Sequence, residues 1–386
     1  MIARHLQPST ACVEPSTHQS TLDGSDELEL LLENVCSAAS EGIRHLVPNT
    51  RLEGLALGGG YGRGEGGVLR ESADHDQPYN DIEFFIFIRG HPRLNERRYG
   101  RGLHELAHRL TELAGIEVEF KVLSLAHLAQ SETTMFYHDL VMGHRWIGGA
   151  DPLPVVGASH RNASSIPQHE ATRLLMNRCS GLLYAAERLQ RDTFTSEDAD
   201  FVGRNIAKAQ LALGDAVLCA LGRYHWSCVA RHLTLQSLHT SMPWLPELIT
   251  EHQAGVDFKL HPHRSTASRE QLARHHAWIT PLAEKVWLWV EFMRLGQVYA
   301  SARDYARQPS TLCPETKPWK NRLINGRLSG LRGVLCDRYP RERLLRALPH
   351  LLWQRDLESA RTELRSRSTT FAALVGDYMQ LWNRFN

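Results

Sequence analysis

Two carboxylates stand two positions apart at the start of an apolar run. Asp81 and Glu83 introduce residues 84–88, which have the composition of a buried strand. Because side chains alternate between the two faces of a strand, Asp81 and Glu83 are expected to project from the same face. A buried sheet gains nothing from an unpaired carboxylate, whose burial is costly. The pair is therefore predicted to bind a divalent cation such as Mg²⁺, which prefers oxygen ligands.

A third acid can join this pair. Residues 115–123 alternate between apolar and charged side chains and are predicted to form another strand, with Glu117 and Glu119 on its charged face. If this strand lies beside the first, either glutamate can approach Asp81 and Glu83, and Glu119 is the preferred candidate. Three clustered carboxylates can bind two magnesium ions, or bind metal and supply a base. Both arrangements support phosphoryl or nucleotidyl transfer.

A glycine-rich segment precedes the acidic pair. Residues 58–67 read GGGYGRGEGG, and they follow a short apolar strand predicted near residues 53–58. The free backbone N–H groups of such a loop can hold an anion, for example a phosphate group. A metal-binding pair next to an anion-binding loop predicts a site for metal and phosphate.

The run from Leu57 to Glu65 resembles the GGYGRGE loop of the uridylyltransferases of nitrogen regulation, which belong to the polymerase-β-like nucleotidyltransferase superfamily. The superfamily pattern is a strand, a glycine turn, a strand with two acids, and a third acid on a later strand. The resemblance covers roughly residues 30–155. It implies an α+β fold and a metal site in which Asp81, Glu83 and Glu119 bind two magnesium ions.

The resemblance also implies nucleotide contacts. Gly59, Gly60 and Tyr61 would lie against the phosphates of an NTP, and Arg63 would neutralise charge. Lys208 lies in a segment similar to helices appended to nucleotidyltransferases and would reach the triphosphate, although a solvent-facing lysine is an equal alternative. The implied reaction transfers a nucleoside monophosphate to a hydroxyl acceptor on a small molecule or protein and releases pyrophosphate. A nucleotide-binding regulatory module without catalysis is the alternative, and a nucleic-acid partner is not favoured.

One departure from the superfamily pattern concerns spacing. Asp81 follows Gly60 by 21 positions, about twice the usual separation, so residues 69–78 are predicted to be an insertion. The insertion contains a second candidate pair, Asp74 and Asp76. Gln77 and Pro78 follow this pair, and a proline ends a strand, so Asp81 and Glu83 are preferred.

A rival motif predicts a different metal. His104, Glu105 and His108 match the HExxH pattern of zinc peptidases, in which two histidines on one helix face bind zinc and the glutamate activates water. Glu132 could supply a third ligand. Arg109 follows where such enzymes prefer an uncharged residue, and 21 histidines make a chance match common. A zinc peptidase is therefore a distant alternative.

Bulk properties favour a soluble protein with two parts. No apolar run reaches the roughly 20 residues of a membrane span, and no apolar signal segment opens the chain, so a cytoplasmic location without a membrane partner is expected. The seven cysteines include no CxxC pair and are expected to be reduced thiols. Residues 1–155 hold 13 Lys and Arg against 22 Asp and Glu, whereas the remainder is basic. This split suits a triphosphate held between the two parts.

The predicted organisation is a small mixed-sheet domain followed by an all-α domain. Ser25 is expected to cap a helix over residues 26–46, Thr280 and Pro281 to begin a new helix, and Arg178 to form an interhelical ion pair with Asp215. The predicted boundaries are residues 1–25 disordered, 26–155 nucleotidyltransferase-like, 156–167 linker and 168–386 helical.

Overall fold

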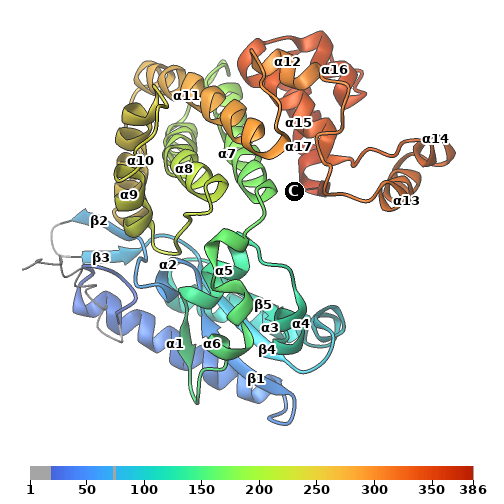
Figure 1. Ribbon diagram of the computed structural model, residues 1–386. Helices are drawn as coiled ribbons and strands as arrows, with labels where there is room; N and C mark the ends of the chain where they lie inside the picture. The colour runs from blue at the N-terminus through green and yellow to red at the C-terminus, as the bar shows by residue number, and fades with distance from the viewer. Residues whose placement is uncertain (1–18, 73–74, 386) are drawn as a thin grey trace, which may run out of the picture.

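The computed structural model describes residues 19–72 and 75–385, and it is α+β with a small mixed sheet, as predicted. In Figure 1 the sheet and its helices lie below a larger group of helices. Each group has its own hydrophobic core. Within the described residues, no strand follows residue 147, which agrees with the all-α prediction for the second half.

Four strands form the main sheet in the described residues, in the order β5-β4-β1-β6. β4 is parallel to β5 and antiparallel to β1, and β1 is antiparallel to β6. In the β4–β5 register Glu83 lies opposite Glu119, so the sheet itself brings two of the predicted ligands together. The strands are β1 Leu52–Leu57, β4 Ile82–Ile88, β5 Val118–Leu123 and β6 Arg145–Ile147.

The predicted insertion forms a hairpin. β2 (Val68–Ser72) pairs antiparallel with β3 (His75–Pro78) in a separate two-stranded sheet. The glycine-rich run before it contains a single helical turn, α2 (Gly59–Gly62). The hairpin thus lengthens the connection from the glycine turn to β4 without entering the main sheet.

Strand alternation distributes the β4 side chains between two helical layers. Phe84 and Ile86 face the core shared with α1 (Asp26–Leu46) and α3 (Pro92–Ala114), whereas Phe85 and Phe87 face the opposite core. The opposite layer contains α4 Leu125–Gln130, α5 Met135–Met142 and α6 Leu153–Val156. The bounds of α1 match the prediction, because the Ser25 side chain accepts a hydrogen bond from the Leu28 N–H and acids fill the first turn.

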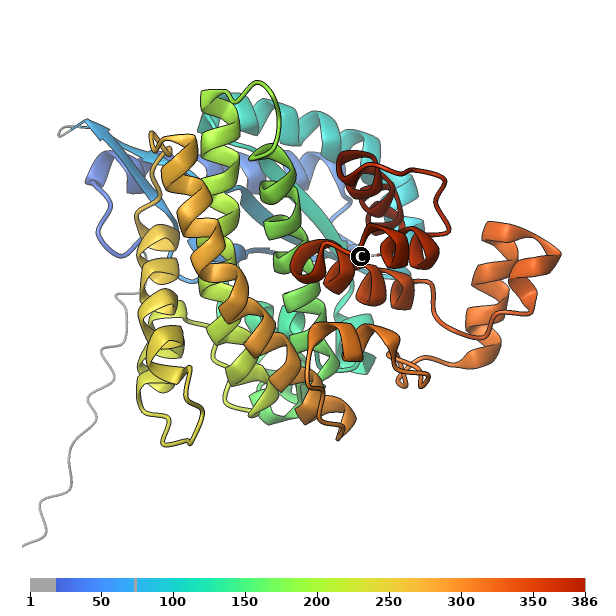
Figure 2. The same ribbon diagram turned by 90° about the horizontal axis from the view of Figure 1, so that it is seen from above.

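The second half packs around the long helices α7 and α8, whose buried faces carry mostly Leu, Ala and Val. Figure 2 shows α13 and α14 projecting from this group. The helices are α7 His169–Arg188, α8 Ser196–Ala220, α9 Cys228–Gln236, α10 Leu245–Leu260, α11 Arg269–Leu295, α12 Ala302–Arg307, α13 Pro318–Ser329, α14 Leu331–Val334, α15 Arg341–Pro349, α16 Leu357–Leu364 and α17 Phe371–Phe385, with a π-helical turn η3 at His350–Gln354.

The predicted helix boundary at Thr280 and Pro281 is wrong, because α11 continues through the proline. Buried positions keep their helical spacing on both sides of it, from Ile279 to Ala283, so packing offsets the missing N–H. The Thr280 hydroxyl also donates to the His276 carbonyl at 2.7 Å. Tertiary burial has outweighed the local start signal here.

Residues 19–25 and the predicted linker both make defined contacts. Residues 19–25 belong to the segment predicted to be disordered, yet Ser20 is fully buried and its carbonyl accepts a hydrogen bond from the Gly66 N–H at 3.0 Å. The predicted linker contains the 3-10 turns η1 Ala158–His160 and η2 Ala163–Ser165. His160 in this connector is buried and bonded to α4 and α5. Among residues 19–72 and 75–385, no helix combines the length and apolar character needed to cross a membrane.

Candidate metal and nucleotide site

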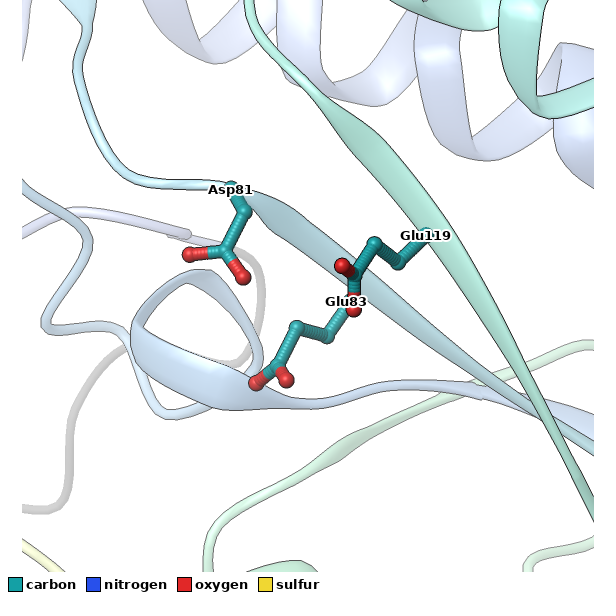
Figure 3. A group of neighbouring side chains, drawn as sticks. All are labelled: Asp81, Glu83 and Glu119. Atoms are coloured by element: carbon teal, nitrogen blue, oxygen red, sulfur yellow. The ribbon is translucent and has the colours of Figure 1, made fainter. Parts of the chain in front are cut away.

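The three predicted carboxylates lie together. One oxygen atom from each of Asp81, Glu83 and Glu119 lies within 4.8 Å of the others. Figure 3 shows that the side chains come from β4, the residue before it, and β5. Asp81 is exposed, and the two glutamates are half-buried. In the part of the chain that the structure describes, this is the one group of three or more potential metal ligands.

The alternative acids are placed elsewhere. Glu117 does not belong to the carboxylate group. Asp76 accepts hydrogen bonds from the Ser25 N–H at 2.7 Å and from Arg70 Nε at 3.2 Å, so it ties the hairpin to the start of α1. Asp74 lies outside the described residues. The structure therefore assembles the preferred set.

The HExxH residues lie on the exposed side of α3. His108 pairs with Glu112 at 3.6 Å, and Glu105 pairs with Arg101 at 3.1 Å, as ordinary partners one helical turn apart. Within the described residues, neither Glu132 nor any other side chain joins His104 and His108 in a group of three ligands. The arrangement expected for a zinc peptidase is not formed.

The glycine turn abuts the carboxylates. Gly59 has φ +62°, and a Cβ atom built on it would lie 2.7 Å from Glu83 Oε2. The Gly58 N–H donates to the Glu83 carbonyl at 2.8 Å, which fixes the turn against β4. Glycine at position 59 thus allows both the left-handed backbone and the close approach of the turn to the acid.

Tyr61 supports the turn from inside the protein. Its side chain is 1% exposed, and its hydroxyl donates to the Gly67 carbonyl and accepts from the Tyr79 N–H, both at 3.0 Å. Burial raises the pKa of the Tyr61 hydroxyl to about 12. The Tyr61 side chain does not line the cavity described next. Any contact of this turn with a nucleotide would therefore come from its backbone.

A cavity of about 490 Å³ separates Asp81 and Glu83 from the helical group. Gly59, Gly60, Asp81 and Glu83 line one wall. The opposite wall carries residues of α7, α8 and α10, among them Arg178, Lys208 and Lys259. Lys208 thus lines the same cavity as Asp81 and Glu83.

These three cations share an unusual environment. Among the described residues, none forms a hydrogen bond or ion pair with another side chain. Burial lowers the pKa of all three, and neighbouring cations, including Arg178 beside Lys208, add to the effect for both lysines. The Lys208 side chain lines the cavity and is exposed to solvent. Cations held near one another with no ion pair to an acid among the described residues indicate a place for an anionic ligand.

Arg63 also lines the cavity, but its guanidinium group already forms an ion pair. Its Nη1 lies 3.2 Å from Asp139 Oδ2, which also accepts a hydrogen bond from the Tyr224 hydroxyl at 3.2 Å. Burial raises the pKa of the Asp139 carboxyl, although the positive charge of Arg63 acts to lower it. Arg63 is therefore a paired cation at the edge of the site.

The predicted ion pair between Arg178 and Asp215 is wrong within the described residues. Asp215 instead accepts hydrogen bonds from Arg231 Nε at 2.6 Å and from His252 Nε2 at 3.1 Å. Burial opposes ionisation of Asp215, but these partners lower its pKa. Arg231 and His252 lie on α9 and α10, so Asp215 joins three helices and leaves Arg178 free to face the cavity.

Glu65, at the end of the glycine turn, was not identified from the sequence. Its carboxylate is 3% exposed and accepts hydrogen bonds from Ser227 Oγ at 2.5 Å and from the Cys228 N–H at 2.9 Å, at the start of α9. Burial alone would raise the pKa of Glu65, but these bonds, with Arg231 and Arg63, lower it. The glycine turn is thus fastened to the helical group.

We expect Glu65→Gln to lower the free energy of unfolding at neutral pH by about 1–3 kcal/mol, because the start of α9 loses a charged acceptor. A lowered carboxyl pKa stabilises the folded state above the ordinary value of 4.5, and this contribution is lost as pH falls through the folded-state value. Stability should therefore depend less on pH below 4.5 in the variant. Urea unfolding at several pH values tests this, with Glu41→Gln, an exposed glutamate, as the control. Equal behaviour of the two variants would contradict it.

Comparisons with known proteins add no assignment: no protein-family model matches the sequence, and no curated protein matches it. The chemistry of the cavity is therefore inferred from its carboxylates, its glycine turn and its cations.

Proposed function

We propose that this protein catalyses magnesium-dependent transfer of a nucleoside monophosphate from an NTP to a hydroxyl group on a small molecule or a protein, with release of pyrophosphate. One observation carries the proposal. Asp81 and Glu83, two of the three clustered carboxylates, line the same cavity as three cations that form no ion pair among the described residues. Metal ligands on one wall and cations on the other suit a metal-bound polyphosphate. A nucleotidyltransferase-like arrangement of β4, β5 and the glycine turn is part of the proposal.

The side chains present fit magnesium. Asp81, Glu83 and Glu119 offer the oxygen ligands that this ion prefers, with atoms close enough to share it. When bound, magnesium would neutralise and orient the phosphate oxygens. Gly59 and Gly60 would present backbone to the phosphates without side chains in the way.

The reaction forms one bond and breaks another. The acceptor oxygen would bond to the α-phosphorus while the bond from that phosphorus to the bridging oxygen of the β-phosphate breaks, and pyrophosphate leaves with the electron pair. Glu119 would take the hydroxyl proton or serve as the third metal ligand. Arg178, Lys208 and Lys259 would stabilise the charge on the departing pyrophosphate.

The test is transfer of label. The protein is incubated with magnesium, each of the four NTPs labelled at the α-phosphate, and separate metabolite and protein extracts. We expect pyrophosphate release with label attached to an acceptor for at least one NTP, and neither product with Asp81→Asn. Transfer that persists in Asp81→Asn would place the chemistry elsewhere.

A second candidate is a nucleotide-binding regulatory module without catalysis. Lys121 favours it, because its ammonium group pairs with Glu83 and lies 3.7 Å from Glu119 Oε2, where a metal would bind. This candidate predicts that NTPs raise the melting temperature while pyrophosphate release stays at background with every NTP and every extract.

A further inference from the structure

The ammonium group of Lys121 is held among the predicted metal ligands by the sheet. Lys121 follows Glu119 by two positions on β5 and therefore projects from the same face. Its Nζ atom forms an ion pair with Glu83 Oε1 and lies 3.7 Å from Glu119 Oε2. Two of the three carboxylates thus share one resident cation.

The ammonium group of Lys121 also lies near an aromatic ring. In the β4–β5 register Lys121 lies opposite Phe85, and its Nζ atom is 5.6 Å from the centroid of the Phe85 ring. Phe85 is 2% exposed, so this aromatic surface is fixed in the core. The lysine side chain is 37% exposed, so the ammonium group beside Glu83 is accessible to solvent.

The charges then decide how many divalent ions the group can hold. Three carboxylates carry three negative charges, and the Lys121 ammonium offsets one of them. The two that remain match a single divalent cation. Asp81 forms no ion pair with any described residue, and Glu83 Oε2 faces the glycine turn, so oxygen atoms are left for one ion. A second ion would have to share Glu83 and Glu119 with the Lys121 ammonium group. Two positive charges bound to the same carboxylates repel each other strongly.

We propose that Lys121 is a tethered cation that takes the place of a second divalent metal, so that the nucleotide-free protein binds one ion at Asp81, Glu83 and Glu119. The inference rests on the proposed function, because it concerns the same metal site. It replaces the two-ion expectation drawn from the superfamily resemblance. Lys121 would thereby set both the number of ions and the affinity of the empty site.

The test counts Mn²⁺ ions by titration of nucleotide-free protein, with free Mn²⁺ followed by electron paramagnetic resonance. Wild type should bind one ion per chain. Lys121→Met keeps a side chain of similar length without the charge, and it should bind two ions, the first at least about tenfold more tightly than wild type. Lys285→Met is the matched control: Lys285 lies on α11 and pairs with Glu247 at 3.7 Å, away from the cavity, so this variant should titrate as wild type.

The outcomes separate the two proposals. Two ions in wild type, or an unchanged count and affinity in Lys121→Met, would overturn the role of Lys121 and leave the metal site standing. No Mn²⁺ binding by wild type would overturn the metal site and the proposed function with it. Melting curves check that each variant folds, and Lys121→Gln replaces the methionine variant if the latter does not.

Discussion

Asp81→Asn abolishes magnesium-dependent turnover, with an expected loss of at least about 1000-fold in kcat. The substitution removes the charge of a metal ligand but keeps its size. Asp81 is exposed and precedes β4, so the variant should fold and melt as wild type does. Glu83→Gln should have a similar effect on turnover. Pyrophosphate release at saturating magnesium measures both.

Asp76→Asn is the control for this prediction, because Asp76 belongs to the second acidic pair in the insertion. Asp76 bonds to Arg70 and the Ser25 N–H, so its loss should affect stability more than turnover per folded molecule. Full activity in Asp81→Asn together with inactive but folded Asp76→Asn would move the site to the hairpin.

Lys208→Ala weakens NTP binding by about 1–3 kcal/mol, the scale of a charge-assisted hydrogen bond. In the nucleotide-free protein, burial and the nearby Arg178 and Arg204 lower the pKa of Lys208 and so disfavour its charged form. Removing it should therefore cost the nucleotide-free protein no stability. As pH rises, NTP binding by wild type should begin to weaken below the ordinary lysine pKa of 10.5, because Lys208 has a lowered pKa and loses its proton at a lower pH. Calorimetric titration with NTP and magnesium measures the affinity.

Lys285→Ala, outside the cavity, provides the control and should bind NTP as wild type does. If Lys208→Ala binds NTP as tightly as wild type, the helical group does not contact the triphosphate. Its wall of the cavity would then serve the acceptor.

The features that local patterns encode could be predicted from the sequence. The helix after Ser25 has its predicted bounds because cap, acids and apolar spacing lie within one short segment. The alternation of residues 115–123 was enough to place Glu119 on the same side as Glu83 once the strands were assumed to be neighbours. The choice between Glu117 and Glu119 needed the strand register, which no local pattern contains.

The features that could not be predicted depend on partners far apart in the chain. Glu65 accepts a hydrogen bond from Ser227, 162 positions away, and no sequence pattern near either residue predicts this contact. Asp215 was assigned the wrong arginine because Arg178 and Arg231 both lie on neighbouring helices, and only packing distinguishes them. The helix break expected at Pro281 failed for a related reason, since burial on both sides of the proline outweighs the local signal.

Calorimetric titration of the full chain with each NTP in the presence and absence of magnesium tests the central claim most directly, because it requires no knowledge of the acceptor. At least one NTP should bind one-to-one, and magnesium should strengthen the binding. Asp81→Asn should remove the magnesium effect, whereas Lys208→Ala should weaken binding in both conditions. Absence of binding by all four NTPs, or binding that is indifferent to both magnesium and Asp81, would contradict a metal–nucleotide site between the sheet and the helical group.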